Sequence, residues 1–362
     1  MTIRCVAVTA YSDIAEAHLF IGLVQSGCRV TVLCPEDAPH CRLMAAGGVD
    51  LYPLRLNRRV DTRGIALIRH HLKSMDARIL HLFNNKAVTN GLLAATGLDV
   101  RVIAYRGVSG REKLYSPYAW LTYLNPRIKR VVCVSEAVRR AYDDMSVMGI
   151  GPSQERFVTI YKGHSQDWYH PLPQGLSGFG VPSDAFVVGT IATMRSRNPK
   201  GIPELLEAVR YMDESIHVII VGQMDEKRIN RIPGREKWQG RVHFTGMRRD
   251  ASAIIGCASV YVLPSVKKEG LPKTVIEAMA QGVPPVVTDA GGSPELVVHG
   301  KSGLVIPAGD VRAISDAVMK LKNDAALRAS MGIAARERIA SHFHYQTTVD
   351  KTLALYRELA GS

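Results

Sequence analysis

Residues 262–297 read V-L-P-S-V-K-K-E-G-L-P-K-T-V-I-E-A-M-A-Q-G-V-P-P-V-V-T-D-A-G-G-S-P-E-L-V. The pattern predicts a strand over residues 259–263, a charged loop, a helix over Lys273–Ala280 and a second buried strand over Pro285–Thr288. Gly282 ends the helix, because glycine readily adopts the left-handed turn that closes one. The stretch is therefore one strand-loop-helix-strand unit of a parallel sheet, and ligands of such sheets bind beyond the carboxyl ends of the strands.

Two carboxylates mark this unit, Glu269 in the loop and Glu277 about one turn into the helix. The peptide N–H groups of residues 270–274 are expected to point toward a ligand, because the start of a helix attracts phosphate. Each carboxylate can accept hydrogen bonds from vicinal hydroxyls, so the pair suits a sugar nucleotide, with the ribose at one end and the hexose at the other. Two ordinary solvated glutamates are the alternative, and the pair alone does not decide between the two interpretations.

The wider pattern is P-S-x3-E-G-L-P-x4-E-A-M-A-x-G-x-P-x-V-x4-G-G-x-P-E, and it resembles the donor-binding core of GT-B glycosyltransferases, specifically the retaining family 4 (group 1). The resemblance covers at least residues 157–304. It implies an α/β fold with two Rossmann-like, doubly wound parallel-sheet domains facing a central cleft. It places Glu269 near the donor sugar hydroxyls and Glu277 on the ribose. The form K-E-G-L-P is most similar to members that build bacterial lipopolysaccharide and other surface glycans.

Strands and helices alternate along both halves of the chain, as in doubly wound sheets. The predicted strands outside the opening stretch are residues 4–9, 30–34, 79–83, 100–105, 131–134, 186–190, 217–221 and 242–245. The predicted helices are residues 14–26, 86–96, 136–145 and 203–212.

We expect the chain to divide into three segments. Residues 1–170 are expected to form a Rossmann-like acceptor-binding domain, and residues 171–341 a Rossmann-like nucleotide-sugar-binding domain. Residues 171–182 are rich in Pro, Gly and Ser and form the one obvious linker. The resemblance implies that residues 342–362 form a helix that crosses back to the N-terminal domain.

Two cations follow the strand at residues 186–190. Arg195 and Lys200 straddle the strand end and the next helix start, where they can bind a diphosphate through guanidinium hydrogen bonds and ammonium charge. Their spacing matches the phosphate-binding pair of the family, and Arg197 is a further candidate. With Glu269 they form the predicted catalytic set, in which the cations offset the charge that grows on the leaving diphosphate. Solvent-exposed loop charges are the alternative.

Other candidate donor-binding residues lie beside these elements. They are Gly270, Leu271, Lys273, Thr274, Gly246, Met247 and Arg248. The family often reads the nucleotide base with backbone near the last three. No residue stands out as a covalent nucleophile. The resemblance implies attack on the face that the leaving group departs from, with retention of the anomeric configuration.

The acceptor candidates lie in two loops of the N-terminal half. The first loop, residues 11–14, lacks the glycines that many relatives carry. Their absence weighs against a close contact with the donor, but Ser12 or Asp13 can still bind the acceptor. Either residue can also cap the next helix. Arg106 stands where relatives often have histidine, and it can hold a phosphate or an anionic acceptor group, or be a structural arginine. Gly107 favours a ligand-facing loop, and Ser109 follows it.

The formal net charge of +13 fits nucleic acid, an anionic membrane or phosphorylated substrates. The residues 64–75 have helical apolar spacing within a basic region, which predicts either a membrane-surface helix or a sheet-covering helix with a solvated basic face. Aromatic and basic residues are not interleaved as in an RNA-binding sheet, so no nucleic-acid partner is expected. The expected partners are a nucleotide-sugar donor, a glycan or lipid-linked acceptor, and an anionic membrane surface.

The location expected from the sequence is cytoplasmic, with peripheral attachment to the inner face of the plasma membrane as a further hypothesis. No apolar run reaches the length of about eighteen residues that a transmembrane helix needs, and the N-terminus reads as a strand rather than a signal peptide. The six cysteines include no C-x-x-C pair and are expected to be reduced thiols. No metal or other cofactor is expected, since the cations supply the charge of a metal.

The sequence thus predicts an enzyme, a hexosyltransferase-type glycosyltransferase of surface-glycan synthesis. Two alternatives remain within the same fold. One is a nucleotide-sugar epimerase, which would need acid-base carboxylates and histidines that do not stand out here. The other is a subunit that binds nucleotide sugar without turnover, suggested by the loop without glycines and by Arg106.

Overall fold

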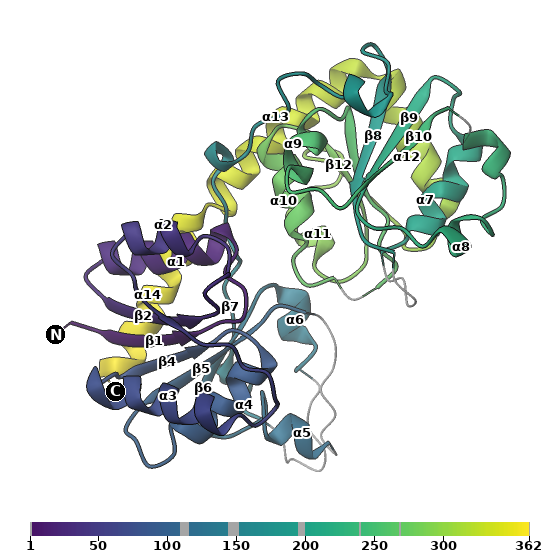
Figure 1. Cartoon of the computed structure of the whole chain (residues 1–362). Coiled ribbons are helices and arrows are strands. Elements are labelled where there is room, and N and C mark those ends of the chain that lie inside the picture. The colour runs from purple at the N-terminus through teal and green to yellow at the C-terminus, as the bar shows by residue number, and fades with distance from the viewer. Residues whose placement is uncertain are drawn as a thin grey trace. The chain divides into compact units, whose positions relative to one another are not determined.

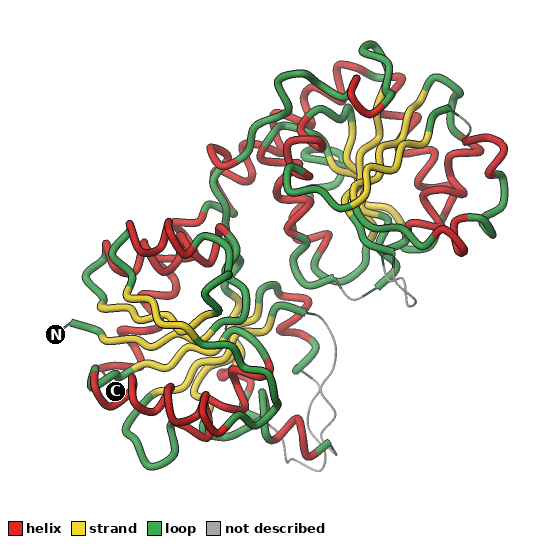
Figure 2. The backbone as a smooth tube through the Cα atoms, in the orientation of Figure 1, coloured by secondary structure: helices red, strands yellow, loops and turns green. Residues whose placement is uncertain are grey.

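The structure of the protein is a computed structural model. It describes residues 2–108, 116–143, 152–194, 200–238, 240–267 and 269–361. The chain forms two compact units, Met1–Gly163 with Phe343–Ser362, and His164–His342. Each unit has one parallel sheet with helices on its faces (Figures 1 and 2). The prediction of two Rossmann-like, doubly wound domains is confirmed.

The sheet of the first unit has seven strands in the order β3-β2-β1-β4-β5-β6-β7. They are β1 (Arg4–Val8), β2 (Arg29–Cys34), β3 (Asp50–Pro53), β4 (Ile79–Leu82), β5 (Arg101–Arg106), β6 (Ile128–Cys133) and β7 (Phe157–Thr159). Val6 of β1 pairs with Thr31 on one side and Leu80 on the other. The strand order reverses between β1 and β4, so the loops after these two strands leave at the topological switch point, where ligands of such sheets bind.

Helices cover this sheet, and the last helix of the chain is one of them (Figure 1). They are α1 (Ile14–Gln25), α2 (Cys41–Ala46), α3 (Thr62–Ser74), α4 (Asn85–Ala94), α5 (Pro117–Trp120), α6 (Glu136–Arg140) and α14 (Tyr345–Gly361). Helix α14 packs against α1, where a Cβ atom on Gly22 would lie 2.6 Å from Val349 Cγ2. It also reaches β4, because the Tyr356 hydroxyl lies 2.9 Å from Nδ1 of buried His81.

The sheet of the second unit has six strands in the order β10-β9-β8-β11-β12-β13. They are β8 (Phe186–Ile191), β9 (Ile216–Val221), β10 (Val242–Gly246), β11 (Val260–Leu263), β12 (Pro285–Thr288) and β13 (Leu304–Ile306). The α-helices are α7 (Ile202–Ala208), α8 (Glu226–Ile229), α9 (Ala251–Gly256), α10 (Lys273–Ala280), α11 (Ser293–Leu296), α12 (Val311–Asn323) and α13 (Ala325–His342). The order reverses between β8 and β11, which places the switch point at the loops after those strands.

Residues 262–297 fold as predicted. Helix α10 and strand β12 have the predicted bounds, β11 begins one residue later than expected, and Gly282 adopts a left-handed φ of +77°. Elsewhere the boundaries shift by one or a few residues. Two helices end well before their predicted bounds. The helix predicted over residues 136–145 ends at Arg140, and in the helix predicted over residues 203–212, α7 ends at Ala208 and a 3-10 turn, Val209–Tyr211, follows.

Helix α3 is the basic amphipathic helix expected near residues 64–75. Its apolar residues Ile68 and Leu72 are buried. Asp61 caps its start by accepting a hydrogen bond from the Gly64 amide at 3.0 Å. The centre of the apolar face therefore packs within the first unit, whereas Ile65 is half-buried and the basic residues Arg63 and Lys73 are exposed.

Candidate functional site

The loops after β8 and β11 come together at the switch point of the second sheet. Glu269, which is 5% exposed, accepts a hydrogen bond at Oε1 from Lys200 Nζ at 2.8 Å and another from Ser265 Oγ at 2.5 Å. A buried carboxylate needs such partners, because burial removes its hydration. Lys200 and Glu269, predicted from two separate loops, are therefore neighbours, and Ser265 is a partner that the sequence analysis missed.

Two glycines let neighbouring loops pack directly against the backbone of the loop that carries Glu269. Gly291 has φ of +58°, and a Cβ atom there would lie 2.1 Å from the Glu269 carbonyl oxygen. The amide of Gly292 donates to the same oxygen at 3.2 Å. On the other side, Gly201 has φ of +67°, and a Cβ atom would lie 1.7 Å from the Pro264 carbonyl oxygen. The glycine pair of the motif thus has a steric reason, which is the approach of its loop to the Glu269 backbone.

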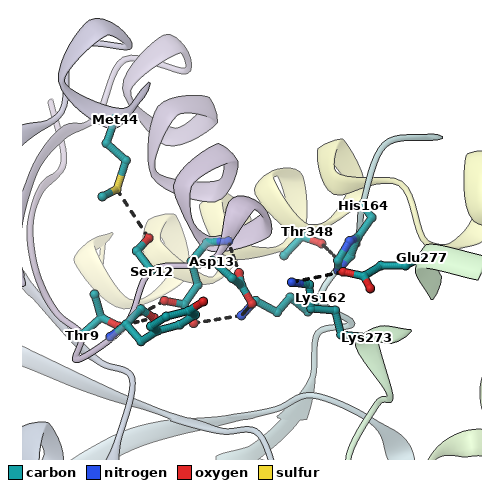
Figure 3. Close-up of polar contacts among 12 residues, drawn as sticks. Thr9, Ser12, Asp13, Met44, Lys162, His164, Lys273, Glu277 and Thr348 are labelled. Atoms are coloured by element: carbon teal, nitrogen blue, oxygen red, sulfur yellow. Dashed lines mark hydrogen bonds and ion pairs between the residues drawn. The ribbon is translucent and has the colours of Figure 1, made fainter. Parts of the chain in front are cut away.

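Glu277 lies on α10 and is 7% exposed. Lys273, one turn earlier, places Nζ 3.2 Å from Glu277 Oε1, and Figure 3 also shows the His164 side chain pointing toward this carboxylate. The N-cap of α10 is Pro272, which makes no side-chain capping hydrogen bond. The first amides of the helix therefore have no capping side chain, which leaves them available to bind an anion.

The remaining donor-binding candidates lie in the loop before α10 and in its first turn. Gly270 and Leu271 lie in the loop between Glu269 and the helix, Gly270 being buried and Leu271 half-buried. Thr274 accepts a hydrogen bond from the hydroxyl of buried Tyr261 at 2.7 Å. The Thr274 hydroxyl thus ties the start of α10 to β11.

A cavity of about 490 Å³ lies at the carboxyl ends of β9 and β10. Gly246, predicted as donor-binding, lines this cavity with Met224, Asn230 and Arg235, which the sequence analysis did not single out. The two residues after Gly246 are placed differently. Met247 is 70% exposed and accepts a hydrogen bond from Thr193 at 3.8 Å, and Arg248 pairs with Asp250 at 2.7 Å. The sequence signal that could have found Asn230 and Arg235 was their position after β9, which pairs with β10, because ligands of such sheets bind beyond the strand ends.

Part of the predicted site lies outside the described residues. These residues are Arg195 and Arg197 on the second unit, and Ser109 on the first. Their assignments stay sequence predictions. The structure does describe Met194, a buried residue, and Lys200 on either side of the two arginines.

The switch point of the first sheet holds a partly buried lysine, whose side chain is 20% exposed, beside two carboxylates (Figure 3). Lys162 Nζ lies 2.8 Å from Asp13 Oδ2 and 2.9 Å from Glu16 Oε1, and Thr9 Oγ1 donates to Glu16 Oε2 at 3.1 Å. Burial alone would lower the pKa of Lys162, but the charges of Glu16 and Asp13 raise the net pKa. The pKa of Glu16 is raised because its burial outweighs the attraction of Lys162. Asp13 also caps α1 by accepting from the Glu16 amide at 3.0 Å.

The other acceptor candidates occupy different environments. Ser12 is fully buried, and its hydroxyl donates to Met44 Sδ at 3.6 Å, so it faces the interior of the unit. The guanidinium of Arg106 stacks over the Tyr123 ring at 4.7 Å from its centroid. Gly107 is exposed. Of these three residues Gly107 is the most exposed, Arg106 is half-buried and Ser12 is buried.

Within the described ranges, no group of three or more His, Cys, Asp and Glu side chains is placed to hold a metal ion. In the same ranges no helix is both long and apolar enough to cross a membrane.

Two family models match the chain, one on each half. Residues 17–168 match the model described as Glycosyltransferase Family 4. Residues 185–324 match the model described as Glycosyl transferases group 1. The second match contains both motif glutamates.

Curated relatives and a solved structure agree with these matches. The capsular polysaccharide biosynthesis glycosyltransferase CapM of Staphylococcus aureus is 25% identical over 295 residues, which are 75% of this chain and 74% of the relative. The phosphatidyl-myo-inositol mannosyltransferase of Mycobacterium leprae is 28% identical over 304 residues, which are 82% and 77% of the two chains. The crystal structure of Anabaena HepE in complex with UDP shares the fold with a TM-score of 0.79, at 19% identity over 99% of this chain and 100% of that one. The chain belongs to the family 4, or group 1, glycosyltransferases of the GT-B fold.

Proposed function

We propose that this glycosyltransferase transfers a hexosyl unit, with retention, from a nucleoside-diphosphate sugar to a hydroxyl of a glycan or lipid-linked acceptor. The observation that carries the proposal is the buried Glu269 at the switch point of the second sheet, held by Lys200 and Ser265 beside α10 and Glu277. Carboxylates bind sugar hydroxyls, and the cation and helix start bind phosphate. Both kinds of group lie within one sheet edge, as a nucleotide sugar requires.

The proposed mechanism needs stabilisation of the leaving group more than acid-base chemistry. Lys200 carries three N–H donors, so it can keep one hydrogen bond to Glu269 and direct others to a diphosphate. Arg195, on its sequence assignment, and the start of α10 would add to this positive potential. Glu269 would orient the donor sugar and Glu277 the ribose. We expect the leaving phosphate oxygen to take the acceptor proton, and the reaction to need no metal.

The wider role that we propose is synthesis of lipopolysaccharide or another bacterial surface polysaccharide. CapM, by its name, acts in capsular polysaccharide biosynthesis, and HepE was solved with UDP; both properties support the proposal by analogy. The acceptor would bind the first unit. A cytoplasmic enzyme on the inner face of the membrane would reach a lipid-linked acceptor, and the basic face of α3 supports electrostatic contact with anionic lipid. Absence of binding to anionic vesicles in a flotation assay would refute the membrane contact.

The decisive experiment is a thermal-shift screen of the full chain against nucleoside diphosphates and their sugars. A ligand that binds only the folded state raises the melting temperature. We expect a shift with one nucleotide, unchanged by a metal chelator and lost in Glu277→Ala. Glu214→Ala, an exposed glutamate before β9, is the matched control and should retain the shift. Absence of a shift from every nucleotide would refute the proposed donor site.

Incubation with the donor that binds then tests for turnover. Release of nucleoside diphosphate, with or without an added acceptor, is expected of a transferase. Binding with no release would favour the non-catalytic subunit, and release of an isomerised sugar would favour the epimerase.

A further inference from the structure

A cavity of about 450 Å³ opens at the switch point of the first sheet. It is bounded by the residues that follow β1, β2, β3 and β4, all within the first unit. This volume is within the range of roughly 300–1,000 Å³ that small-molecule sites occupy. Neither the family motifs nor the predicted acceptor residues include its lining.

The lining combines cationic, amide and apolar groups. The polar residues are Thr9, Arg55, Asn57, Asn84, Asn85 and Lys86. Leu54 and Leu56 supply apolar surface, and none of the described residues that line the cavity carries a carboxylate. Asparagine amides donate to and accept from hydroxyls, whereas the two cations can only donate and carry charge. The set is therefore complementary to a molecule that has both hydroxyls and a negative charge.

The wall of this cavity is held in place before any ligand binds. Lys86 Nζ donates to the carbonyl oxygens of Leu56 and Asn57 at 3.1 and 3.0 Å. Fully buried Asn90, one turn further along α4, donates to the Arg59 carbonyl at 2.9 Å and accepts from the Asp61 amide at 2.7 Å. Helix α4 thus fixes the segment between β3 and α3, and a preorganised wall lowers the entropy lost on binding.

The cations of this cavity are only partly neutralised. Lys86 forms hydrogen bonds to neutral carbonyls and, among the residues that the structure describes, makes no ion pair. Arg55 pairs with Asp37, but both side chains are largely exposed, so solvent weakens their attraction. An anion in the cavity would therefore meet net positive potential.

We propose that this cavity binds an anionic sugar residue of the acceptor, one that carries a phosphate or a carboxylate. The asparagines would bind its hydroxyls, and Arg55 and Lys86 its charge. This inference rests on the proposed function, because it names the acceptor class of that enzyme. It specifies the acceptor end that the family resemblance leaves open.

The test is ligand-observed NMR on the full chain with three matched probes: glucose 6-phosphate, glucuronic acid and glucose. We expect the two charged sugars to bind at least about tenfold more tightly than glucose, and salt to weaken them. Arg55→Gln should weaken both charged sugars about tenfold, or ~1.4 kcal/mol. Equal binding of glucose and the charged sugars, or unchanged binding in Arg55→Gln, would overturn the proposal.

Two variants control for the ion pair and for general charge. Asp37→Asn removes the same ion pair as Arg55→Gln but leaves the arginine, so it should bind charged sugars as well as or better than the parent. Arg58→Gln removes a charge on the same segment outside the lining and should change binding little. Inorganic phosphate binding as tightly as glucose 6-phosphate would reduce the cavity to a simple anion site and overturn the sugar assignment.

The nucleotide thermal shift separates this inference from the proposed function. It depends on the second unit and should be equal in all three variants. Thermal unfolding without ligand, compared with the parent, shows whether their first unit folds. Intact nucleotide shifts with no preference for charged sugars would overturn the cavity assignment alone. Missing nucleotide shifts with selective sugar binding would instead refute the donor site.

Discussion

Lys200 Nζ lies 2.8 Å from Glu269 Oε1, and this ion pair joins the loops that follow β8 and β11, the two strands at the switch point of the second sheet. The lysine side chain is 38% exposed, whereas the glutamate side chain is 6% exposed. The cation is thus the partner with access to a ligand, and the carboxylate is the partner fixed by the fold. A diphosphate that approaches Lys200 would meet a preoriented ammonium rather than a freely rotating side chain.

The two motif glutamates are predicted to separate binding of the nucleotide from binding of the sugar. Glu277→Gln should weaken binding of the free nucleoside diphosphate about tenfold, because a charged acceptor to the ribose hydroxyls is lost. Glu269→Gln should leave nucleoside-diphosphate affinity nearly unchanged but remove the added affinity for the sugar form and abolish turnover. Isothermal titration with both ligands measures the two effects. Equal losses for both ligands in both variants would contradict the assigned roles.

Gly291→Ala is predicted to disrupt the site through the backbone. The new Cβ would lie 2.1 Å from the Glu269 carbonyl oxygen, at a φ of +58° that side chains rarely adopt. Gly309→Ala is the matched control, since its φ is +82° but a Cβ atom there would have open space within 4 Å. The control should lose only about 1–2 kcal/mol of stability, because its alanine meets backbone strain but no steric clash. Thermal unfolding should show a larger loss for Gly291→Ala, together with lost nucleotide-sugar binding that the control retains.

The second unit was the more predictable part of the fold, because its signals are local. The strand, helix and glycine pattern around Lys273–Ala280 specifies its own boundaries, and buried strands such as β8 and β9 read as continuous apolar runs. Strand β3 was missed, since D-L-Y-P at a sheet edge has neither an apolar run nor an alternating pattern. Helix α2 was missed as well, because its six residues follow His40, an N-cap residue without a side-chain capping hydrogen bond.

The contacts of the candidate site were less predictable than its residues. The pattern selected Glu269 and Lys200, but it could not show that they touch, because they are 69 positions apart and meet only when two strands pair. The same is true of Lys162, which bonds to Asp13 across 149 positions. Ser12 was selected as a loop residue, and its burial against Met44 depends on α2, an element that the sequence did not reveal.

Lys162→Met is predicted to make stability strongly dependent on pH. The substitution leaves Glu16 buried without its counter-charge, and breaking a buried pair in this way costs about 3–5 kcal/mol. The pKa of Glu16 is already raised by burial, and loss of Lys162 should raise it further. A carboxyl with a raised folded pKa favours folding at low pH and loses that contribution as pH rises through the folded pKa. Urea unfolding should therefore show a larger loss near neutral pH than in mild acid.

The double variant Lys162→Met with Glu16→Gln is the control for this mechanism. It removes the lysine and the buried Glu16 carboxylate and leaves only the partly exposed Asp13 charged, so much of the stability lost in the single variant should return, and the pH dependence should flatten. A single variant whose loss is the same in acid and near neutral pH would show that lost packing, rather than an uncompensated carboxylate, is responsible.

The contact between His81 and Tyr356 is predicted to make the first unit sensitive to acid. Burial lowers the pKa of His81 from 6.5 to about 3, because the imidazolium would lose its hydration. A lowered folded pKa adds stability above the unfolded value, and that contribution is lost as pH falls from 6.5 toward 3. His81→Phe removes the titration and also the 2.9 Å contact with the tyrosine hydroxyl, so it should be less stable near neutral pH by about 1 kcal/mol.

The expected result is therefore a pair of converging curves. Unfolding free energy plotted against pH should fall less steeply for His81→Phe than for the parent below 6.5, because only the parent has the His81 imidazole, which takes up a proton on unfolding in acid. His342→Phe, on an exposed residue, is the control and should keep the parent slope. Parallel curves for His81→Phe and the parent would place the acid sensitivity elsewhere. Converging curves would show that the last helix is held to β4 by a contact that acid breaks, since the tyrosine partner lies 275 positions away on α14.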